Sequence, residues 1–316
     1  MIDWLLLVES IMPNYPYSEL PRTFVEALGI RTAYYAAGTP AGTPVVFLHG
    51  MSTSADSFRE TMHELSDAFW LLAPDLPGFG FSDNTDPYTV PHLVEWLAAF
   101  RQALDLPPLA LVGHSFGGIL AAAFALSYPE DVTQLLLVAP AILSHQNYPA
   151  LLKKVGASLR LLELGSAVSQ SRPLVRRQVR VPFHDPDRMH ESVWQRRLAD
   201  YQQARASALV LKSTAFYDLR PRLGNLKRPT CLVWGENDPV VPATDAGALA
   251  GMIPNTEVII LPQCGHAPML EQQEKFQEIA RWFLMDDRRW TTGDSSGAAG
   301  GPSPVAGRPS FLKLEI

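Results

Sequence analysis

The chain reads Ala110-Leu-Val-Gly-His-Ser-Phe-Gly-Gly-Ile119 where an apolar strand pattern turns directly into an apolar helix pattern. This arrangement is typical of a nucleophile elbow, in which a serine bracketed by glycines follows a strand and precedes a helix. Gly113 and Gly117 carry no Cβ that would clash where strand and helix crowd together, and the turn projects the Ser115 hydroxyl above the sheet. A tight structural turn without chemistry is the alternative for the pentapeptide taken alone.

Strand and helix patterns alternate on both sides of this turn. Short apolar runs separated by longer helical stretches are typical of parallel strands that are buried on both faces. The sequence therefore predicts an α/β fold with a mostly parallel central sheet covered by helices on both faces. The predicted strands are 45–48, 70–73, 109–112, 132–138, 230–234 and 257–261, preceded by a hairpin of 22–28 and 30–36. The predicted helices are 55–68, 90–104, 119–128, 243–252 and 274–283.

The alternation stops between residues 141 and 223, where helical stretches at 148–164 and 192–215 follow one another without a strand. This segment is inserted after the sixth strand, which places it above the carboxyl ends of the strands, where open α/β sheets bind ligands. We therefore expect a helical cap, and the alternative is an embellishment that contacts no substrate. The expected domains are a core of 1–140 and 224–286, a cap of 141–223 and a flexible tail of 287–316, rich in Gly, Ser and Pro.

The composition is that of a globular protein. A chain of 316 residues with 47% hydrophobic residues is long enough to bury a large core. The net charge of −6 and the absence of a long basic stripe argue against nucleic acid as a partner. No apolar run reaches the length of about 20 residues that a membrane span needs, and the run at 4–8 is too short for a signal peptide. We therefore expect a soluble, cytoplasmic protein, and the sequence gives no indication of its oligomeric state.

The two cysteines are expected to be reduced. Cys231 falls at the start of one predicted strand and Cys264 follows the end of the next. If these strands are parallel, the two thiols lie on the order of 15 Å apart, which is too far for a disulfide.

Two later strand ends supply partners for the serine. A serine hydroxyl is a weak nucleophile, so it needs a base that takes its proton and a carboxylate that orients the base. Asp238 lies in the loop after strand 230–234, and His266 follows strand 257–261. Without the other motifs, an aspartate in a loop like that of Asp238 is more often a turn residue, and a loop histidine like His266 is more often a surface or capping group. The order Ser115, Asp238, His266 is the order expected for a triad on this scaffold, and Asp238 lies further out in its loop than the competing Glu236.

Acyl transfer also needs two hydrogen-bond donors for the developing oxyanion. The elbow offers the backbone N–H of Phe116 at a helix N-terminus, and the loop after strand 45–48 offers that of Met51. Other polar residues are expected to be structural: His49 to organise its loop, His114 to point away from the serine and pack or hydrogen-bond locally, and Asp75 to bind backbone amides. None of the histidines has a metal-binding spacing.

These motifs together resemble the α/β-hydrolase family, and specifically its lidded serine esterase and lipase-like members. The resemblance covers about residues 22 to 285. The matching motifs are Phe47-Leu-His-Gly50, Asp75-Leu-Pro-Gly-Phe-Gly-Phe-Ser-Asp83, Gly113-His-Ser-Phe-Gly-Gly118, Gly235-Glu-Asn-Asp-Pro239 and Gly265-His266. It implies hydrolysis of a small-molecule carboxylic ester through an acyl-enzyme, with no metal and no organic cofactor. The candidates for substrate binding are Phe116, Leu143, Val240 and Phe216.

Departures from subfamily patterns narrow the choice of reaction. The serine at 115 argues against epoxide hydrolases and haloalkane dehalogenases, whose nucleophile is an aspartate. The loop that follows His49 lacks the Gly-Pro-Gly of carbon–carbon bond hydrolases and the Gly-Gly-Pro of prolyl iminopeptidases. The alternatives are other chemistry on the same triad, as in a thioesterase, lactonase, perhydrolase or carbon–carbon bond hydrolase, and a ligand-binding member of the fold with little turnover.

Overall fold

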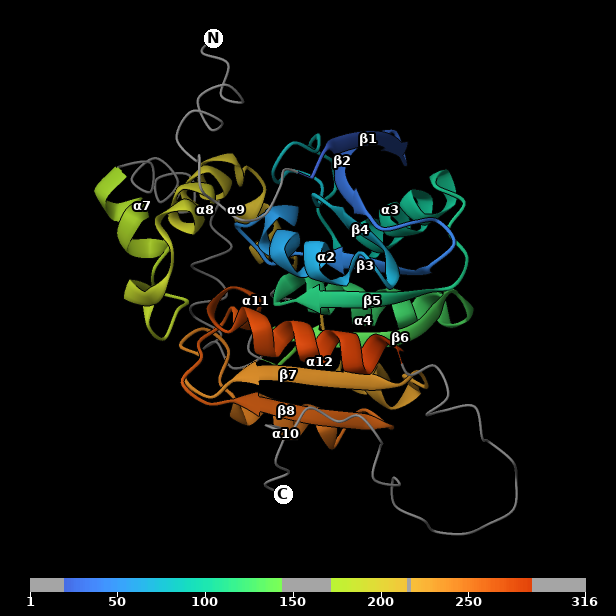
Figure 1. The fold of residues 1–316 in the computed structure, drawn as a ribbon. Helices are drawn as coiled ribbons and strands as arrows, with labels where there is room; N and C mark the ends of the chain where they lie inside the picture. Colours follow the sequence, from blue (N-terminus) through green and yellow to red (C-terminus); the bar gives the residue numbers. More distant parts are fainter. Residues whose placement is uncertain (1–19, 144–171, 215–216, 286–316) are drawn as a thin grey trace.

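The computed structural model describes residues 20–143, 172–214 and 217–285, and an eight-stranded sheet runs through this part of the chain (Figure 1). The strand order is β1-β2-β4-β3-β5-β6-β7-β8. The β1–β2 and β2–β4 pairs are antiparallel, and every pairing from β4 through β3 to β8 is parallel. The strands are β1 Arg22–Ala27, β2 Ile30–Ala37, β3 Thr43–Leu48, β4 Phe69–Pro74, β5 Leu109–His114, β6 Val132–Val138, β7 Thr230–Gly235 and β8 Thr256–Leu261. The predicted fold class is confirmed.

Helices cover both faces of the sheet because each buried strand contributes side chains to two apolar clusters, one on each face. Side chains alternate along a strand, so Val45 and Phe47 pack with α2 and α12, whereas Val46 and Leu48 pack with α3, α4 and α10. The core helices are α2 Arg59–Leu65, α3 Val90–Ala103, α4 Phe116–Ser127, α10 Thr244–Ala250, α11 Pro268–Glu271 and α12 Gln273–Met285. Short 3-10 helices are η1 Ala55–Phe58, η2 Pro129–Asp131, η4 Pro186–Arg188 and η5 Arg220–Asn225.

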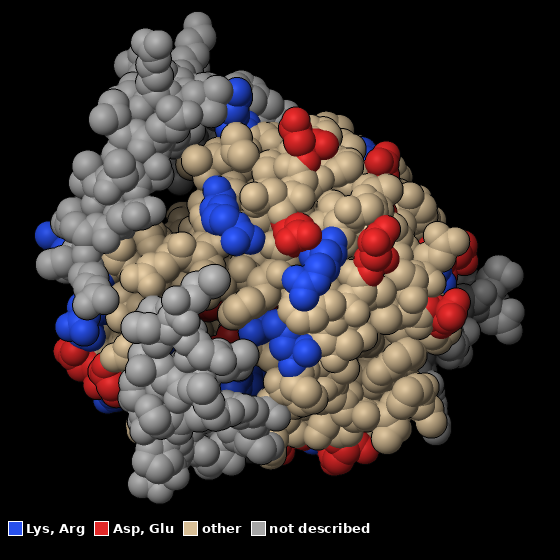
Figure 2. Space-filling model, turned by 90° about the horizontal axis from the view of Figure 1, so that it is seen from above, with Lys and Arg blue, Asp and Glu red and all other residues tan. Residues whose placement is uncertain are grey.

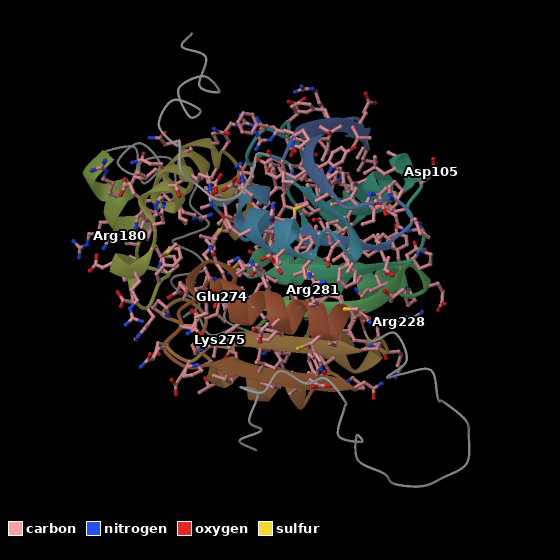
Figure 3. The ribbon with its side chains drawn as sticks, viewed as in Figure 1. Asp105, Arg180, Arg228, Glu274, Lys275 and Arg281 are labelled. Atoms are coloured by element: carbon pink, nitrogen blue, oxygen red, sulfur yellow. The ribbon has the colours of Figure 1, made fainter. Side chains whose placement is uncertain are left out.

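The helices α2 and α12, which lie side by side on one face, are joined at the surface by Arg281 of α12 (Figure 3). Its guanidinium group donates to both carboxylate oxygens of Asp67, at 2.8 and 3.2 Å. Asp67 is exposed and Arg281 is half-buried, so water screens this pair and it contributes little to stability. Burial of the apolar faces holds the layer together.

Among the residues that the structure describes between β6 and β7 are three helices, which we call the inserted helices: α7 Arg172–Gln178, α8 Glu191–Gln203 and α9 Ser207–Thr214. They lie at the end of the sheet toward which the arrowheads of β5, β7 and β8 point (Figure 1). Val175 of α7 and Trp194 of α8 pack into the cluster on the α12 side, and Val210 of α9 packs into the cluster on the α4 side. The inserted helices therefore contact both apolar clusters at the carboxyl edge of the sheet. The domain boundaries expected at 140/141 and 223/224 stay predictions.

The helix boundaries differ from the prediction in three places. The stretch 55–68 is a 3-10 turn followed by α2, because the Ser54 side chain accepts a hydrogen bond from the N–H of Asp56 and caps a tight first turn. The helix predicted from 119 begins at Phe116, directly after the serine. The helix predicted over 192–215 is broken between α8 and α9 by contacts with the core that are described below. The helix predicted at 148–164 and the tail at 287–316 lie outside the described residues.

Cys231 and Cys264 are free and buried, as expected, and burial raises the pKa of the Cys264 thiol. Among the described residues, no helix combines the length and the apolar character needed to cross a membrane.

Candidate active site

Ser115 lies in a strained turn between β5 and α4. Its backbone adopts φ 53° and ψ −112°, a left-handed conformation that is rare for a residue with a side chain. The flanking glycines are required by close packing: a Cβ at Gly113 would lie 2.5 Å from the carbonyl oxygen of Gly117, and one at Gly117 would collide with that of Leu48. The predicted elbow geometry is thus present.

Asp238 and His266 form the expected acid–imidazole pair. Asp238 Oδ2 lies 2.7 Å from His266 Nδ1, and Oδ1 accepts hydrogen bonds from the N–H groups of Val240 and Val241, at 2.8 and 2.9 Å. The Asp238 side chain is fully buried and that of His266 is 7% exposed. The competing Glu236 is exposed. Because Nδ1 donates to the carboxylate, Nε2 is left as the nitrogen that is able to accept a proton.

His114 links the elbow to the loop that carries His266. Its Nε2 lies 2.9 Å from the backbone oxygen of His266, and the two imidazole rings are 4.8 Å apart between centroids. A carbonyl only accepts, so Nε2 carries the proton. Burial lowers the pKa of His114 well below 6.5 and keeps the ring neutral. The hydrogen-bond partner is therefore not local in the sequence, because the loop after β8 reaches the end of β5 and brings His266 next to His114.

The backbone of His266 is held from both sides. While its carbonyl accepts from His114, its N–H donates to the oxygen of Pro182 in the insertion, at 2.7 Å. Glu271 strengthens the same contact, because its carboxylate accepts from the N–H groups of Gly265 and His184, at 2.9 and 2.8 Å. The insertion is thus bonded directly to the loop of the candidate base.

The 49–54 loop lies against the elbow. A Cβ at Gly50 would lie 3.2 Å from Ser115 Cβ, which shows how closely the loop approaches the serine. Within the part of the chain that the structure describes, the N–H groups of Met51 and Phe116 donate to no other residue. The Ser115 hydroxyl likewise bonds to no described residue, including His266. Among the described residues, neither candidate oxyanion donor nor the candidate nucleophile has a competing hydrogen-bond partner.

The predicted structural roles of His49 and Asp75 are confirmed. His49 Nε2 accepts from the N–H of Leu76 at 2.9 Å and Nδ1 donates to the oxygen of Gly50 at 2.8 Å, so the ring connects the loops after β3 and β4. Burial lowers the pKa of His49 to about 3, and the ring is neutral. Asp75 accepts from two backbone N–H groups, each at 2.9 Å, and burial raises its pKa.

The four candidates for substrate binding lie in different environments. Phe116 and Leu143 are 3% and 8% exposed and belong to the apolar cluster on the α4 side of the sheet. Val240 is 44% exposed, next to Asp238. Phe216 lies outside the described residues.

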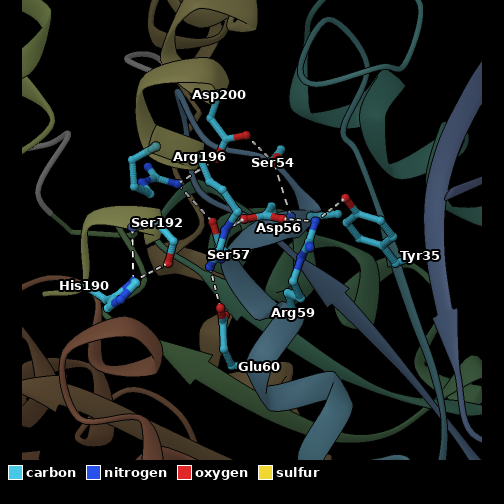
Figure 4. Close-up of polar contacts among 12 residues, drawn as sticks. Tyr35, Ser54, Asp56, Ser57, Arg59, Glu60, His190, Ser192, Arg196 and Asp200 are labelled. Carbon is cyan, nitrogen blue, oxygen red and sulfur yellow. Dashed lines mark hydrogen bonds and ion pairs between the residues drawn. The ribbon is translucent and has the colours of Figure 1, made fainter. Parts of the chain in front are cut away.

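Sequence reasoning missed a buried ion-pair cluster, which we define as Asp56, Arg59, Glu60, Arg196, Arg197 and Asp200 (Figure 4). Arg196 of α8 bonds Asp56 at 2.5 Å and also bonds Glu60. Burial opposes the charge of Asp56, but the neighbouring guanidinium groups hold its pKa below the ordinary value. The adjacent arginines in an amphipathic helix were the sequence signal, although nothing local identified their partners.

Asp200 is the second buried aspartate of this cluster. It accepts from Ser54 Oγ at 2.5 Å and from Arg197 at 3.1 Å. Burial raises the pKa of Asp200 to about 7 despite the guanidinium beside it. On the face seen from above, Lys and Arg side chains lie among Asp and Glu side chains (Figure 2).

A cavity of about 690 Å³ lies between the 84–89 loop and α9, and its lining includes Tyr88 and Lys212. None of Ser115, Asp238 and His266 lines it. No three His, Cys, Asp or Glu side chains in the described ranges are placed to hold a metal ion.

Comparison with known proteins matches residues 43–273 to the family described as the alpha/beta hydrolase fold. The human protein named monoacylglycerol lipase ABHD6 is 28% identical over 269 residues, which cover 79% of this chain and 78% of that protein. A 2-hydroxy-6-oxo-2,4-heptadienoate hydrolase of Pseudomonas putida is 29% identical over 82% of this chain and 95% of that protein. The crystal structure of a bacterial membrane phospholipase A superposes with a TM-score of 0.74 at 23% identity, over 90% of this chain and 92% of that one.

Proposed function

The chain belongs to the alpha/beta hydrolase family, and from that membership we propose that it is a serine hydrolase that cleaves carboxylic esters through an acyl-enzyme. The observation that carries the proposal is the 2.7 Å contact between Asp238 and His266 at the same sheet edge as the strained Ser115. A relative named as a monoacylglycerol lipase supports an ester as the substrate.

The proposed reaction has two steps. His266 Nε2 takes the proton of Ser115 as the serine oxygen attacks the ester carbonyl, and the Asp238 carboxylate stabilises the imidazolium that forms. The N–H groups of Met51 and Phe116 bind the oxyanion, and donors of this kind are each worth about a hundredfold or more in rate. The protonated His266 then gives its proton to the leaving alcohol. Water next attacks the acyl carbonyl while His266 takes its proton. The bond between the acyl carbon and the Ser115 oxygen then breaks, His266 returns the proton to Ser115, and the carboxylic acid leaves.

We further propose that the insertion acts as a cap over this site and that Phe116, Leu143, Val240 and Phe216 contact the substrate. The position of the inserted helices at the carboxyl edge of the sheet supports the cap, because ligands bind at this edge in open α/β sheets. A cytoplasmic location stays a prediction from the sequence.

A panel of nitrophenyl esters of increasing acyl length tests the proposal. In Ser115→Ala we expect turnover to fall at least about a thousandfold, because the nucleophile is lost and only binding and oxyanion contacts remain. The matched control is Ser213→Ala on α9, whose hydroxyl donates to the carbonyl of Val210 in its own helix and to no other residue that the structure describes. A fluorophosphonate probe should label the wild type and the control but not Ser115→Ala. Undiminished ester hydrolysis by Ser115→Ala would refute the mechanism.

A second candidate substrate is a 2-hydroxy-6-oxo-dienoic acid, because a relative at 29% identity is named for such a compound. The loop after His49 lacks the Gly-Pro-Gly of carbon–carbon bond hydrolases, which favours the ester. Adding a dienoate, a thioester and a lactone to the same panel ranks the alternatives by kcat/KM.

A further inference from the structure

The inserted helices hold the loop of the proposed oxyanion donor through two serine hydroxyls. Ser52 Oγ lies 2.8 Å from Ser207 Oγ at the start of α9, and Ser54 Oγ donates to Asp200 of α8 at 2.5 Å. The Ser207 hydroxyl also donates to the carbonyl of Ala204 at 3.2 Å. Because a hydroxyl has one proton, Ser52 is the donor in the serine pair and Ser207 the acceptor.

Ser52 is the residue of this loop that needs such a support. It directly follows Met51 and has φ 61°, in the left-handed region that residues with a side chain rarely adopt. Strained conformations persist only where the surrounding contacts determine them. On the core side, the Thr53 hydroxyl donates to the oxygen of Gly50 at 2.8 Å. On the insertion side, the partner of Ser52 is Ser207.

Ser207 is itself fixed relative to the core. The preceding N–H of Ala206 donates to the oxygen of Gly78 at 3.2 Å, and Arg205 donates to the oxygen of Ser82 at 2.8 Å. Ala206 packs so closely that a Cβ on Gly78 would lie 2.5 Å from its own Cβ. These contacts break the helix between α8 and α9 and place the Ser207 oxygen at a defined point above the loop.

We propose that Ser207 is a positioning residue for the oxyanion hole: by accepting the hydrogen bond of Ser52 it keeps the Met51 N–H directed at the ester carbonyl over Ser115. The inference rests on the proposed function, since it needs Met51 as a donor. Ser207 touches no substrate in this scheme and acts only through Ser52.

The experiment compares kcat and KM for Ser207→Ala, Ser52→Ala and the double variant, with Ser213→Ala on the same helix as the control. Loss of one neutral hydrogen bond corresponds to a fall in kcat of about fivefold to tenfold. We expect this fall in each single variant with KM within about twofold of the wild type, since the oxyanion contact forms only in the transition state. The double variant should lose no more than either single variant, because both remove the same bond.

If the contact between Ser52 and Ser207 only stabilises the fold, its loss in Ser207→Ala would lower the urea midpoint and leave kcat unchanged. Affinity for a trifluoromethyl ketone, which forms an oxyanion adduct, should fall by the same factor as kcat in Ser207→Ala. Ser207→Thr, which retains a hydroxyl and serves if the alanine variant does not fold, should keep wild-type kcat.

A wild-type kcat in Ser207→Ala, or additive losses in the double variant, would overturn the inference. Failure of the proposed function is distinguishable, because it appears as activity in Ser115→Ala. If Ser115→Ala is inactive while Ser207→Ala matches the wild type, only the positioning role is refuted.

Discussion

Acidification should destabilise this protein through His49, the buried imidazole that connects the loops after β3 and β4. The residue is fully buried, its Nε2 accepts the N–H of Leu76, and its pKa is lowered from 6.5 to about 3. The unfolded chain therefore takes up a proton before the folded protein does. The stability that the neutral ring provides is present above pH 6.5 and is lost as the pH falls toward 3.

The loss of stability on acidification can be calculated from the shift in the pKa of His49. Each pH unit between the two pKa values corresponds to about 1.4 kcal/mol, so the loss is about 2 kcal/mol at pH 5 and approaches about 5 kcal/mol near pH 3. Protonation of Nε2 also removes the acceptor for Leu76, so the loop that precedes Met51 should loosen over the same range.

Urea unfolding at about pH 8 and about pH 5 measures this loss. Between these two pH values the free energy of unfolding should fall by about 2 kcal/mol more in the wild type than in His49→Gln, because the glutamine does not titrate. The exposed His63, replaced as His63→Gln, is the matched control for the exchange of histidine for glutamine. The other titrating groups are common to all three proteins and cancel in the comparison. Equal losses in the wild type and in His49→Gln would refute the reasoning.

Three further outcomes are expected. Asp238→Asn should lower kcat by about four orders of magnitude, because the amide no longer favours the tautomer of His266 that accepts the serine proton; steady-state kinetics measures this. Arg196→Met should cost about 3–5 kcal/mol, since it leaves two buried carboxylates without their shared partner; urea denaturation measures it, and a cost below 1 kcal/mol would contradict it. Gly265→Ala should cost about 1–3 kcal/mol by overpacking, because its Cβ would lie 2.5 Å from the oxygen of Pro182; a thermal midpoint equal to the wild type would speak against this.

The sheet was predictable because the sequence patterns that indicate its strands are local. Apolar runs such as 132–138 belong to strands buried on both faces, and the observed strands agree with the predicted ones to within one or two residues. The triad candidates were predictable for a related reason: in a parallel sheet, residues that follow successive strands meet at one edge. Asp238 and His266 accordingly lie in contact although no pattern joins them directly.

The missed features depend on contacts between distant segments. The break between α8 and α9 has no glycine or proline to announce it, and it arises where Ala206 meets the oxygen of Gly78. The bond from His114 to the carbonyl of His266 joins residues 152 positions apart. The pairing of Arg196 with carboxylates 136 and 140 residues away has the same character. Such features follow from the tertiary structure and leave no mark in the local sequence.

The contact between the insertion and the His266 loop is made to a main-chain carbonyl, that of Pro182. Any amino acid at this position supplies the same acceptor, so sequence divergence of the insertion does not by itself remove it. What must be conserved is the path of the chain at this point and the absence of a side chain at Gly265. A lineage is therefore free to exchange the residues that select a substrate while the base keeps its place, and grafting an insertion from another member should succeed where that path is reproduced.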